Sequence, residues 1–241
     1  MNAMIFAAGL GTRLKPLTNS TPKALVPFRG KTLLWFAIKS VVDAGATRVI
    51  VNVHHFADQI INYIQSEQWG VEVLISDERD ELLDTGGGLV KAAPLFIPDQ
   101  PILIRNADIV TSVDCKKIMA AHLTMKNNVT LMIKKRSTSR YLVFDEQMNL
   151  CAWKNVNTGE RIVLKESTDG EDYGFSGIHV LDYKMLQAFG AQRPFSIIQG
   201  YLEASATTQI KGWVMEQADE WFDVGTVEKL KQAEEYYSKT K

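Results

Sequence analysis

The chain has 241 residues with nearly balanced charge, 27 basic against 28 acidic side chains, which argues against a broad nucleic-acid-binding surface. Hydrophobic residues make up 46% and charged residues 23%, as in an ordinary folded globular protein, and this excludes extensive disorder. With two distant cysteines, Cys115 and Cys151, no apolar run of membrane-spanning length and no signal-peptide flank, we expect a reduced, cytoplasmic protein with no disulfide framework, zinc site or membrane span.

The first half of the chain alternates strand-like and helix-like segments. Continuous apolar or β-branched runs predict strands at residues 3–7, 49–53, 71–75 and 101–104. Helical spacing of apolar residues predicts helices at residues 33–42, 60–64 and 89–96. Continuous apolar strands that alternate with helices favour a parallel sheet covered on both faces.

The pattern changes after about residue 128. Short strands are predicted at residues 129–133, 141–144, 150–153 and 175–181, with one or two more within 214–224. Helices are predicted at residues 197–206 and at the C-terminal end, where Val227, Leu230, Ala233 and Tyr237 share one face. We therefore predict an α/β fold, a Rossmann-like three-layer sandwich with a mostly parallel central sheet and a hairpin-rich second half.

A glycine loop at residues 7–13, Ala-Ala-Gly-Leu-Gly-Thr-Arg, directly follows the first strand. Glycines there let backbone N–H groups approach a phosphate without a Cβ clash. A dinucleotide-binding fingerprint would have glycine where Leu14 stands, and the Gly-Lys-Ser/Thr end of a Walker A loop is absent. Arg13 instead offers a bidentate phosphate ligand, and Lys23 follows Pro22 as a second cation. The alternative is a tight turn with surface cations, but the arginine and the Pro-Lys pair at this spacing favour phosphate binding.

The chain resembles the sugar-1-phosphate nucleotidyltransferases, also called NDP-sugar pyrophosphorylases. The loop and the run at residues 22–27 resemble that family's signature, G-x-G-T/S-R followed by P-K-x-L-x-P. Shorter motifs follow in the family's order at residues 84–88, 106–108, 175–177 and 222–226. Within the family the chain is most similar to N-acetylmuramate-1-phosphate uridylyltransferases and small mannose-1-phosphate guanylyltransferases. It has no C-terminal hexapeptide repeats, so the acetyltransferase domain of bifunctional members is not expected.

The resemblance implies an enzyme that makes an NDP-sugar and pyrophosphate from a nucleoside triphosphate and a sugar-1-phosphate. The reaction is an in-line displacement at the α-phosphorus with Mg²⁺ as cofactor. The resemblance also implies a single domain, residues 1–241, with a nucleotide-binding half (about 1–127) and a sugar-phosphate half (about 128–241). No nucleic-acid or membrane partner is expected, and the oligomeric state is not predicted.

The same resemblance assigns site residues. Arg13 and Lys23 are the catalytic cations, and Asp108 and Asp223 are the metal ligands. Without the family context, Asp108 reads as a helix-capping or turn residue and Asp223 as part of a buried salt bridge. Many relatives have glycine where this chain has Ala107; the extra methyl would approach nucleotide or sugar, and we expect a single methyl to be accommodated.

Substrate contacts are expected from both halves, with residues 85–88 contacting base or ribose through backbone groups. For the sugar phosphate, Lys154 competes with Lys165, and neither has the family's usual Glu-Lys-Pro context; an exposed strand lysine is the alternative reading of Lys154. The predicted binding residues are Ala7, Ala8, Gly9, Gly11, Thr12, Thr85, Gly86, Gly87, Asn106, Lys154 and Gly177.

Other polar motifs read as structural. The acidic residues at 77–81 predict a solvated loop, the basic run 134–136 with Arg140 predicts a solvated hairpin, and His54-His55 suit a capping or pocket-lining role. Two rival functions stay open: a phosphocholine cytidylyltransferase, which phosphocholine and cytidine triphosphate would test, and a non-catalytic nucleotide-sugar-binding protein. Magnesium-dependent pyrophosphate release would indicate an enzyme and exclude the non-catalytic binding protein. The base and the sugar are not predicted.

Overall fold

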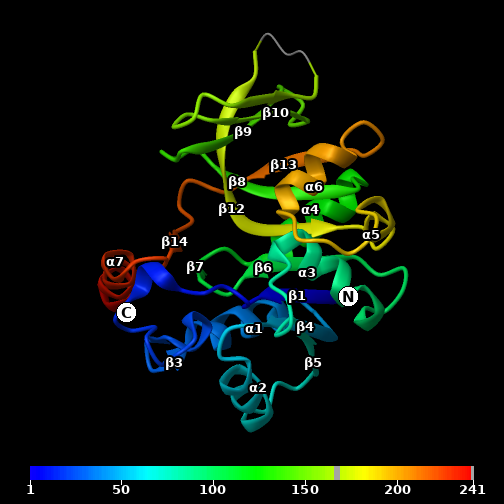
Figure 1. Cartoon of the computed structure of the whole chain (residues 1–241). Coiled ribbons are helices and arrows are strands. Elements are labelled where there is room, and N and C mark those ends of the chain that lie inside the picture. The colour runs from blue at the N-terminus through cyan, green and yellow to red at the C-terminus, as the bar shows by residue number, and fades with distance from the viewer. Residues whose placement is uncertain (166–168, 240–241) are drawn as a thin grey trace.

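The computed structural model describes residues 1–165 and 169–239. In this part of the chain ten strands form one sheet (Figure 1), in the order β11-β10-β9-β12-β6-β1-β4-β5; β8 also pairs with β12, and β13 pairs with β8. The bounds of these strands are β1 Asn2–Phe6, β4 Arg48–Val53, β5 Glu72–Asp77, β6 Ile102–Asn106, β8 Val129–Lys134, β9 Arg140–Phe144, β10 Leu150–Asn155, β11 Arg161–Val163, β12 Glu171–Leu181 and β13 Ile210–Val214.

The first half contributes the parallel part of the sheet, as its continuous apolar strands predict. β1 lies between β4 and β6 and is parallel to both, with Ile5 opposite Val51 on one side and Arg105 on the other. β5 adds to the outer edge of β4, again in parallel. The carboxyl ends of β1 and β6 therefore reach the same edge of the sheet, where ligands bind in open α/β folds.

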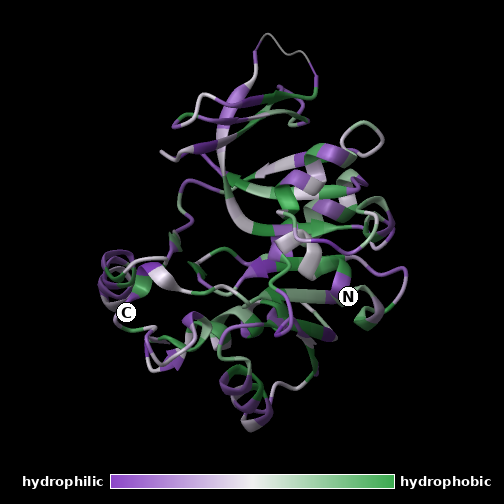
Figure 2. Cartoon of the chain, in the orientation of Figure 1, coloured by the Kyte–Doolittle hydropathy of each residue, from purple (hydrophilic) through white to green (hydrophobic). Residues whose placement is uncertain are grey.

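Helices cover both faces of this sheet because side chains alternate along each strand. Ala3 and Ile5 of β1 face one apolar cluster, and Met4 and Phe6 face the other. The first cluster is closed by α1 Leu33–Asp43, α2 Ala57–Ser66 and α4 Cys115–Met125. The second is closed by α3 Asp84–Ala92, α5 Met185–Ala188 and α6 Ile197–Ala204. Helices on both faces of the sheet confirm the predicted three-layer build, and Figure 2 shows hydrophobic stretches along the strands that these helices cover.

The second half is hairpin-rich, as predicted. The long strand β12 runs antiparallel to β6, β8 and β9, so it joins the two halves in one sheet. Its pairing with β8 breaks register between Phe175 and His179, and Gly177 there has a positive φ of 76°. A β-bulge of this kind bends a strand, and Figure 1 shows β12 rising from the central sheet to the outer hairpin of β9 and β10.

The C-terminal segment returns to the first half. β14 (Trp221–Asp223) pairs antiparallel with β7 (Ile109–Thr111), and α7 (Val227–Lys239) follows it. A third apolar cluster joins Leu230 and Ala233 of α7 to Leu14, Phe28 and Val110 of the first half. A two-stranded pair of β2 (Pro27–Phe28) and β3 (Lys31–Thr32) and three 3₁₀ turns, Thr12–Leu14, Lys23–Leu25 and Ala93–Leu95, complete the described elements.

The structure corrects several boundaries. The predicted helix at residues 89–96 begins at Asp84 and ends at Ala92 instead, so the glycines at 86–88 belong to α3. The predicted strand region 214–224 is two separate strands, and α4, β7 and β11 were not predicted. None of the helices in the described residues is both long enough and apolar enough to span a bilayer. The expected cytoplasmic location stays a prediction.

Candidate active site

The glycine loop lines a cavity of about 520 Å³, here called the glycine-loop cavity. The Ala7 N–H donates to Oδ1 of Asn52 at 2.7 Å, and the Gly11 carbonyl accepts from the Thr18 hydroxyl at 2.8 Å, so both ends of the loop are fixed. Gly11 has a φ of 65°, and a Cβ there would lie 3.0 Å from Cβ of Lys23. Glycine is therefore needed at 11, because it tolerates this backbone and leaves room for the lysine. Ala7, Ala8, Gly9 and Thr12 line the cavity as well.

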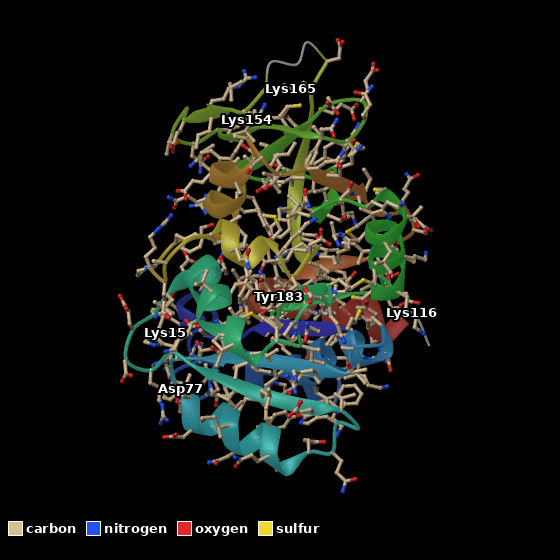
Figure 3. The ribbon with its side chains drawn as sticks, turned by 90° about the vertical axis from the view of Figure 1, so that its right-hand side faces the viewer. Lys15, Asp77, Lys116, Lys154, Lys165 and Tyr183 are labelled. Carbon is tan, nitrogen blue, oxygen red and sulfur yellow. The ribbon has the colours of Figure 1, made fainter. Side chains whose placement is uncertain are left out.

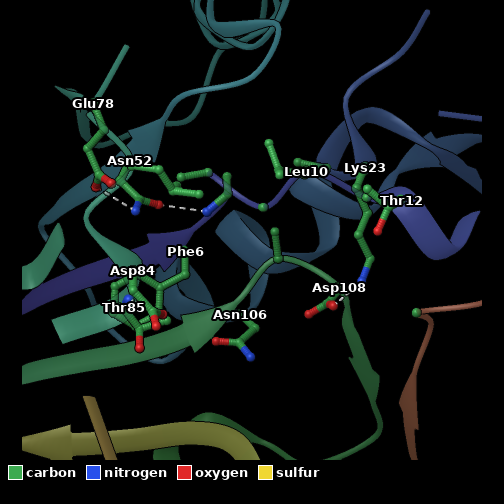
Figure 4. A pocket seen from close by; sticks show the side chains of 18 of the residues that line it. Phe6, Leu10, Thr12, Lys23, Asn52, Glu78, Asp84, Thr85, Asn106 and Asp108 are labelled. Atoms are coloured by element: carbon green, nitrogen blue, oxygen red, sulfur yellow. Dashed lines mark hydrogen bonds and ion pairs between the residues drawn. The ribbon is translucent and has the colours of Figure 1, made fainter. Parts of the chain in front are cut away.

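Both predicted cations reach this cavity. Lys23 opens the second 3₁₀ turn, and its ammonium is ion-paired with Oδ2 of Asp108 (Figure 4). Arg13 belongs to the first 3₁₀ turn and is exposed; its Nη2 lies 3.1 Å from where a Cβ on Gly225 would stand. The sequence separates Arg13 from Gly225 by almost the whole chain, and the fold places them side by side.

The two predicted metal ligands come together through the pairing of β7 with β14. Asp108 lies between β6 and β7, and Asp223 ends β14 opposite Ile109. The Val224 N–H donates to the Asp108 carbonyl at 3.0 Å, which locks the two aspartate-bearing segments to each other. Both carboxylates are partly exposed, and Asp223 lies 3.6 Å from the ammonium of Lys229. Asp108 lines the glycine-loop cavity, as does Gly225, two residues after Asp223.

This donor set fits a hard divalent cation. Carboxylate oxygens are the ligands that Mg²⁺ prefers, and Mg²⁺ keeps water and phosphate oxygens in its remaining positions. The described residues contain no cluster of three or more His, Cys, Asp or Glu side chains that could cage a metal. Both carboxylates are partly exposed, and each also faces a lysine, Lys23 or Lys229. A magnesium ion shared with a substrate would bind the same carboxylates that these lysines contact.

A buried pair at the far end of the cavity was missed by the sequence reasoning. Glu78 is completely buried, and its Oε1 accepts from Nδ2 of Asn52 at 2.7 Å (Figure 4). Burial raises the pKa of Glu78, with the Asn52 hydrogen bond opposing this. The prediction of a solvated loop at 77–81 is wrong for Glu78, although Asp77 and Arg79 do form an exposed ion pair. The signal was Asn52 itself, a polar residue inside an otherwise apolar strand.

The glycines of α3 contact protein instead of the cavity. The Gly86 N–H donates to the Phe195 carbonyl at 2.8 Å, and a side chain at Gly87 would collide with the Arg193 carbonyl. These small residues let the start of α3 approach the chain before α6. The predicted backbone contact of Gly86 and Gly87 with the nucleotide stays a prediction. Thr85 does line the cavity, while its hydroxyl accepts from the Ile197 N–H at 2.8 Å.

Asn106 and Gly177 are neighbours in space. Asn106 ends β6 and lines the glycine-loop cavity. A Cβ on Gly177 would stand 2.9 Å from Nδ2 of Asn106 and 3.2 Å from Cγ1 of Ile109. Gly177 thus packs against the Asn106 side chain and does not itself line this cavity.

The two lysine candidates lie on the outer hairpin. Lys154 pairs with Asp172 at 2.6 Å, and its ammonium lies 5.6 Å from the ring centroid of Tyr141. Lys165 is more exposed and lies 3.8 Å from Asp145. Figure 3 shows both at the hairpin end of the molecule, opposite the end that carries Lys15 and Asp77. Neither lines the glycine-loop cavity, so the contact of Lys154 with a sugar phosphate stays a prediction.

A larger cavity of about 780 Å³, the second-half cavity, lies between the hairpin strands and α6. Its apolar wall includes Leu142, Trp153 and Phe175, and Arg136, Ser196 and Gln199 add polar groups. Of the thirteen described residues that line it, seven are polar or charged, among them Arg140, Glu160 and Glu203. The cavity therefore suits a polar small ligand that also packs against the apolar wall.

Comparison with known proteins identifies the family. Residues 2–240 match the sequence profile of the nucleotidyl transferases. The chain belongs to this family. It is 30% identical over 232 residues to the N-acetylmuramate alpha-1-phosphate uridylyltransferase of Caulobacter vibrioides, covering 92% of this chain and 91% of that one. It is 27% identical over 226 residues to the mannose-1-phosphate guanylyltransferase catalytic subunit beta of Drosophila pseudoobscura, and there spans 58% of the relative's length.

The fold of this nucleotidyltransferase is also that of solved structures. The crystal structure of HddC from Yersinia pseudotuberculosis superposes with a TM-score of 0.78 at 23% identity, covering 98% of this chain and 99% of that chain. The same protein has been solved in complex with GMP-PN, with a TM-score of 0.76 at 24% identity. The predicted family and fold class are confirmed.

Proposed function

We propose that this nucleotidyltransferase transfers a nucleotidyl group from a nucleoside triphosphate to a sugar-1-phosphate and releases pyrophosphate. The observation that carries the proposal is the meeting of Arg13, Lys23, Asp108 and Asp223 at one end of the glycine-loop cavity. The names of the relatives support the choice of acceptor, since both act on sugar 1-phosphates.

The chemistry joins two anions, so the site must neutralise charge more than it must move protons. The backbone N–H groups of the glycine loop and the guanidinium of Arg13 bind the triphosphate and stabilise the departing pyrophosphate. Lys23, held in place by Asp108, contacts the reacting phosphates. Asp108 and Asp223 would hold Mg²⁺, which when bound neutralises phosphate charge and orients the phosphate oxygens.

Each of the two cavities takes one of the two substrates. The glycine-loop cavity is built mainly from the first half and takes the nucleoside triphosphate, with the base toward Asn52 and Glu78. The second-half cavity takes the sugar phosphate. Residues 175–177 of β12 separate the two, since Phe175 lines one cavity and Gly177 supports Asn106 of the other.

The transfer is a direct displacement with no covalent enzyme intermediate. A nucleotidylated enzyme needs an activated nucleophile. Cys115 and Cys151 are both buried, and Nδ1 of His54 is engaged by the Glu78 carbonyl at 2.7 Å. Direct displacement predicts sequential kinetics and inversion at the α-phosphorus. Parallel double-reciprocal lines, or exchange of labelled pyrophosphate into the triphosphate without acceptor, would contradict it.

The deciding experiment is a panel of four nucleoside triphosphates against glucose, mannose and N-acetylmuramate 1-phosphates, followed by pyrophosphate release with and without Mg²⁺. We expect magnesium-dependent release with at least one pair. Phosphocholine with cytidine triphosphate is the comparison acceptor. Release with phosphocholine alone, or none with any acceptor, would contradict the proposed function.

A further inference from the structure

One cation of the second-half cavity differs from its neighbours in the basic run 134–136. Lys134 donates to the Asp219 carbonyl at 3.1 Å, and Lys135 is exposed and ion-paired with Glu171 at 2.9 Å. Arg136 is half-buried and lines the cavity. The predicted solvated hairpin therefore describes Lys135 but not Arg136.

The contacts of Arg136 are all with neutral groups. Its Nη2 donates to the Phe175 carbonyl at 3.0 Å, and its guanidinium carbon lies 4.6 Å from the ring centroid of Trp221. Its Nε is buried and has no hydrogen-bond partner in the described residues. Among those residues no carboxylate lies within ion-pair distance of this side chain. Burial lowers the pKa of Arg136, and the charge of Asp223 partly opposes this.

A half-buried guanidinium with neutral partners is incompletely compensated, because removing a charge from water is costly unless an opposite charge replaces the solvent. A bound anion would supply that charge. Packing fixes the position of the guanidinium. The Trp221 ring stacks against it. Gly174 leaves space for it, because a Cβ at residue 174 would lie only 2.7 Å from Nε of Arg136.

The location of Arg136 identifies the anion. Trp221 lies two residues before Asp223 on β14, and its Nε1 donates to the Ser176 carbonyl at 2.8 Å. The guanidinium thus lies where the cavity wall, the bulge of β12 and the strand carrying Asp223 meet. An acceptor bound in this cavity must present its phosphate at this junction to reach the α-phosphorus beside Asp108 and Asp223.

We propose that Arg136 binds the phosphate of the acceptor and aims its attacking oxygen at the α-phosphorus. This rests on the proposed function. One phosphate oxygen forms the new bond to the α-phosphorus, and the bond from that phosphorus to the bridging oxygen of pyrophosphate breaks. Arg136 exchanges no proton, because a guanidinium stays charged throughout. It takes the role that the sequence suggested for Lys154, which is engaged with Asp172.

The test compares Arg136→Gln, Arg136→Lys and the control Lys135→Gln, which removes the adjacent exposed cation. We expect Arg136→Gln to raise KM for the sugar-1-phosphate by about 10- to 100-fold, the range for one charged hydrogen bond, with KM for the triphosphate nearly unchanged. Arg136→Lys should raise KM for the sugar-1-phosphate less, because an ammonium keeps the charge but lacks the paired N–H donors of a guanidinium. Lys135→Gln should match the wild type in both constants.

A binding measurement separates this inference from the proposed function. Mannose 1-phosphate and N-acetylmuramate 1-phosphate are titrated into wild type and Arg136→Gln, following tryptophan fluorescence, since Trp221 lies against the guanidinium. Binding by the wild type that Arg136→Gln weakens supports the inference even without turnover. An active wild type with an unaffected Arg136→Gln overturns the inference alone, as does an equal loss of triphosphate affinity. A wild type that neither binds nor turns over any sugar-1-phosphate overturns both proposals.

Discussion

Gly177→Ala tests whether the bulge of β12 supports the active site. The new methyl must adopt a φ of 76°, which costs an L-residue about 1–2 kcal/mol. It would also stand 2.9 Å from Nδ2 of Asn106 and 3.2 Å from Cγ1 of Ile109, and crowding of this kind costs about 1–3 kcal/mol. Because Asn106 lines the glycine-loop cavity, relief of the clash moves an active-site side chain. A displacement of about 1 Å reduces activity by up to about 100-fold.

Gly159→Ala is the matched control. Gly159 has a φ of 74°, and a Cβ there meets nothing within 4 Å. It carries the same backbone cost without the crowding and should keep full activity. We therefore expect Gly177→Ala to be less stable than Gly159→Ala by about 1–3 kcal/mol in urea unfolding, and to lose kcat/KM about 10- to 100-fold. Equal stability and equal activity of the two variants would refute the role of Gly177 behind Asn106.

Three further predictions follow from the site and the core. Asp223→Asn should lower kcat by at least about 100-fold with little change in Tm, since its nearest cation is 3.6 Å away and partly exposed; near-full activity at saturating Mg²⁺ would remove Asp223 from the metal ligands. Arg13→Lys should lower kcat by at least about 10-fold because a charged hydrogen bond of the fork is lost, and a change confined to KM would show ground-state binding only. Burial lowers the pKa of His179 to about 3. The His179 side chain therefore stays neutral in the folded protein, whereas in the unfolded chain it binds a proton below about pH 6.5. Stability present above pH 6.5 is therefore lost as the pH falls, by about 2 kcal/mol at pH 5, and His179→Leu should lose about 2 kcal/mol less between pH 7.5 and 5 in urea unfolding.

The strands of the first half were predictable because a strand that is buried on both faces needs apolar residues at consecutive positions. β4 is such a run, with five of its six residues buried. Short elements carried no such signal. β7 has three residues, and β11 is exposed throughout, so neither shows a hydrophobic period. The start of α3 was hidden because its first turns contain three glycines, which have low helix propensity.

The candidate site was predictable where chemistry fixes the residue type locally. The glycine loop with Arg13, and the aspartates Asp108 and Asp223, are short-range patterns whose meaning came from resemblance to the family. Glu78 and Arg136 could not be assigned this way. Each lies in a charged segment whose composition is typical of solvated surface. Only tertiary packing makes Glu78 fully buried and brings Arg136 into a cavity wall, while the adjacent Arg79 and Lys135 are exposed.

The return of the chain after β13 explains why the first half alone cannot build the proposed site. Asp223 reaches Asp108 only because β14 pairs with β7, and that pairing is held by the apolar side of α7 against Phe28 and Val110. The same strand carries Trp221, against which Arg136 stacks. One short strand therefore links the two carboxylates proposed as metal ligands to Trp221, against which a residue of the second-half cavity wall packs. A change in α7 that loosens β14 should disturb both proposed substrate sites together, although α7 lines neither cavity.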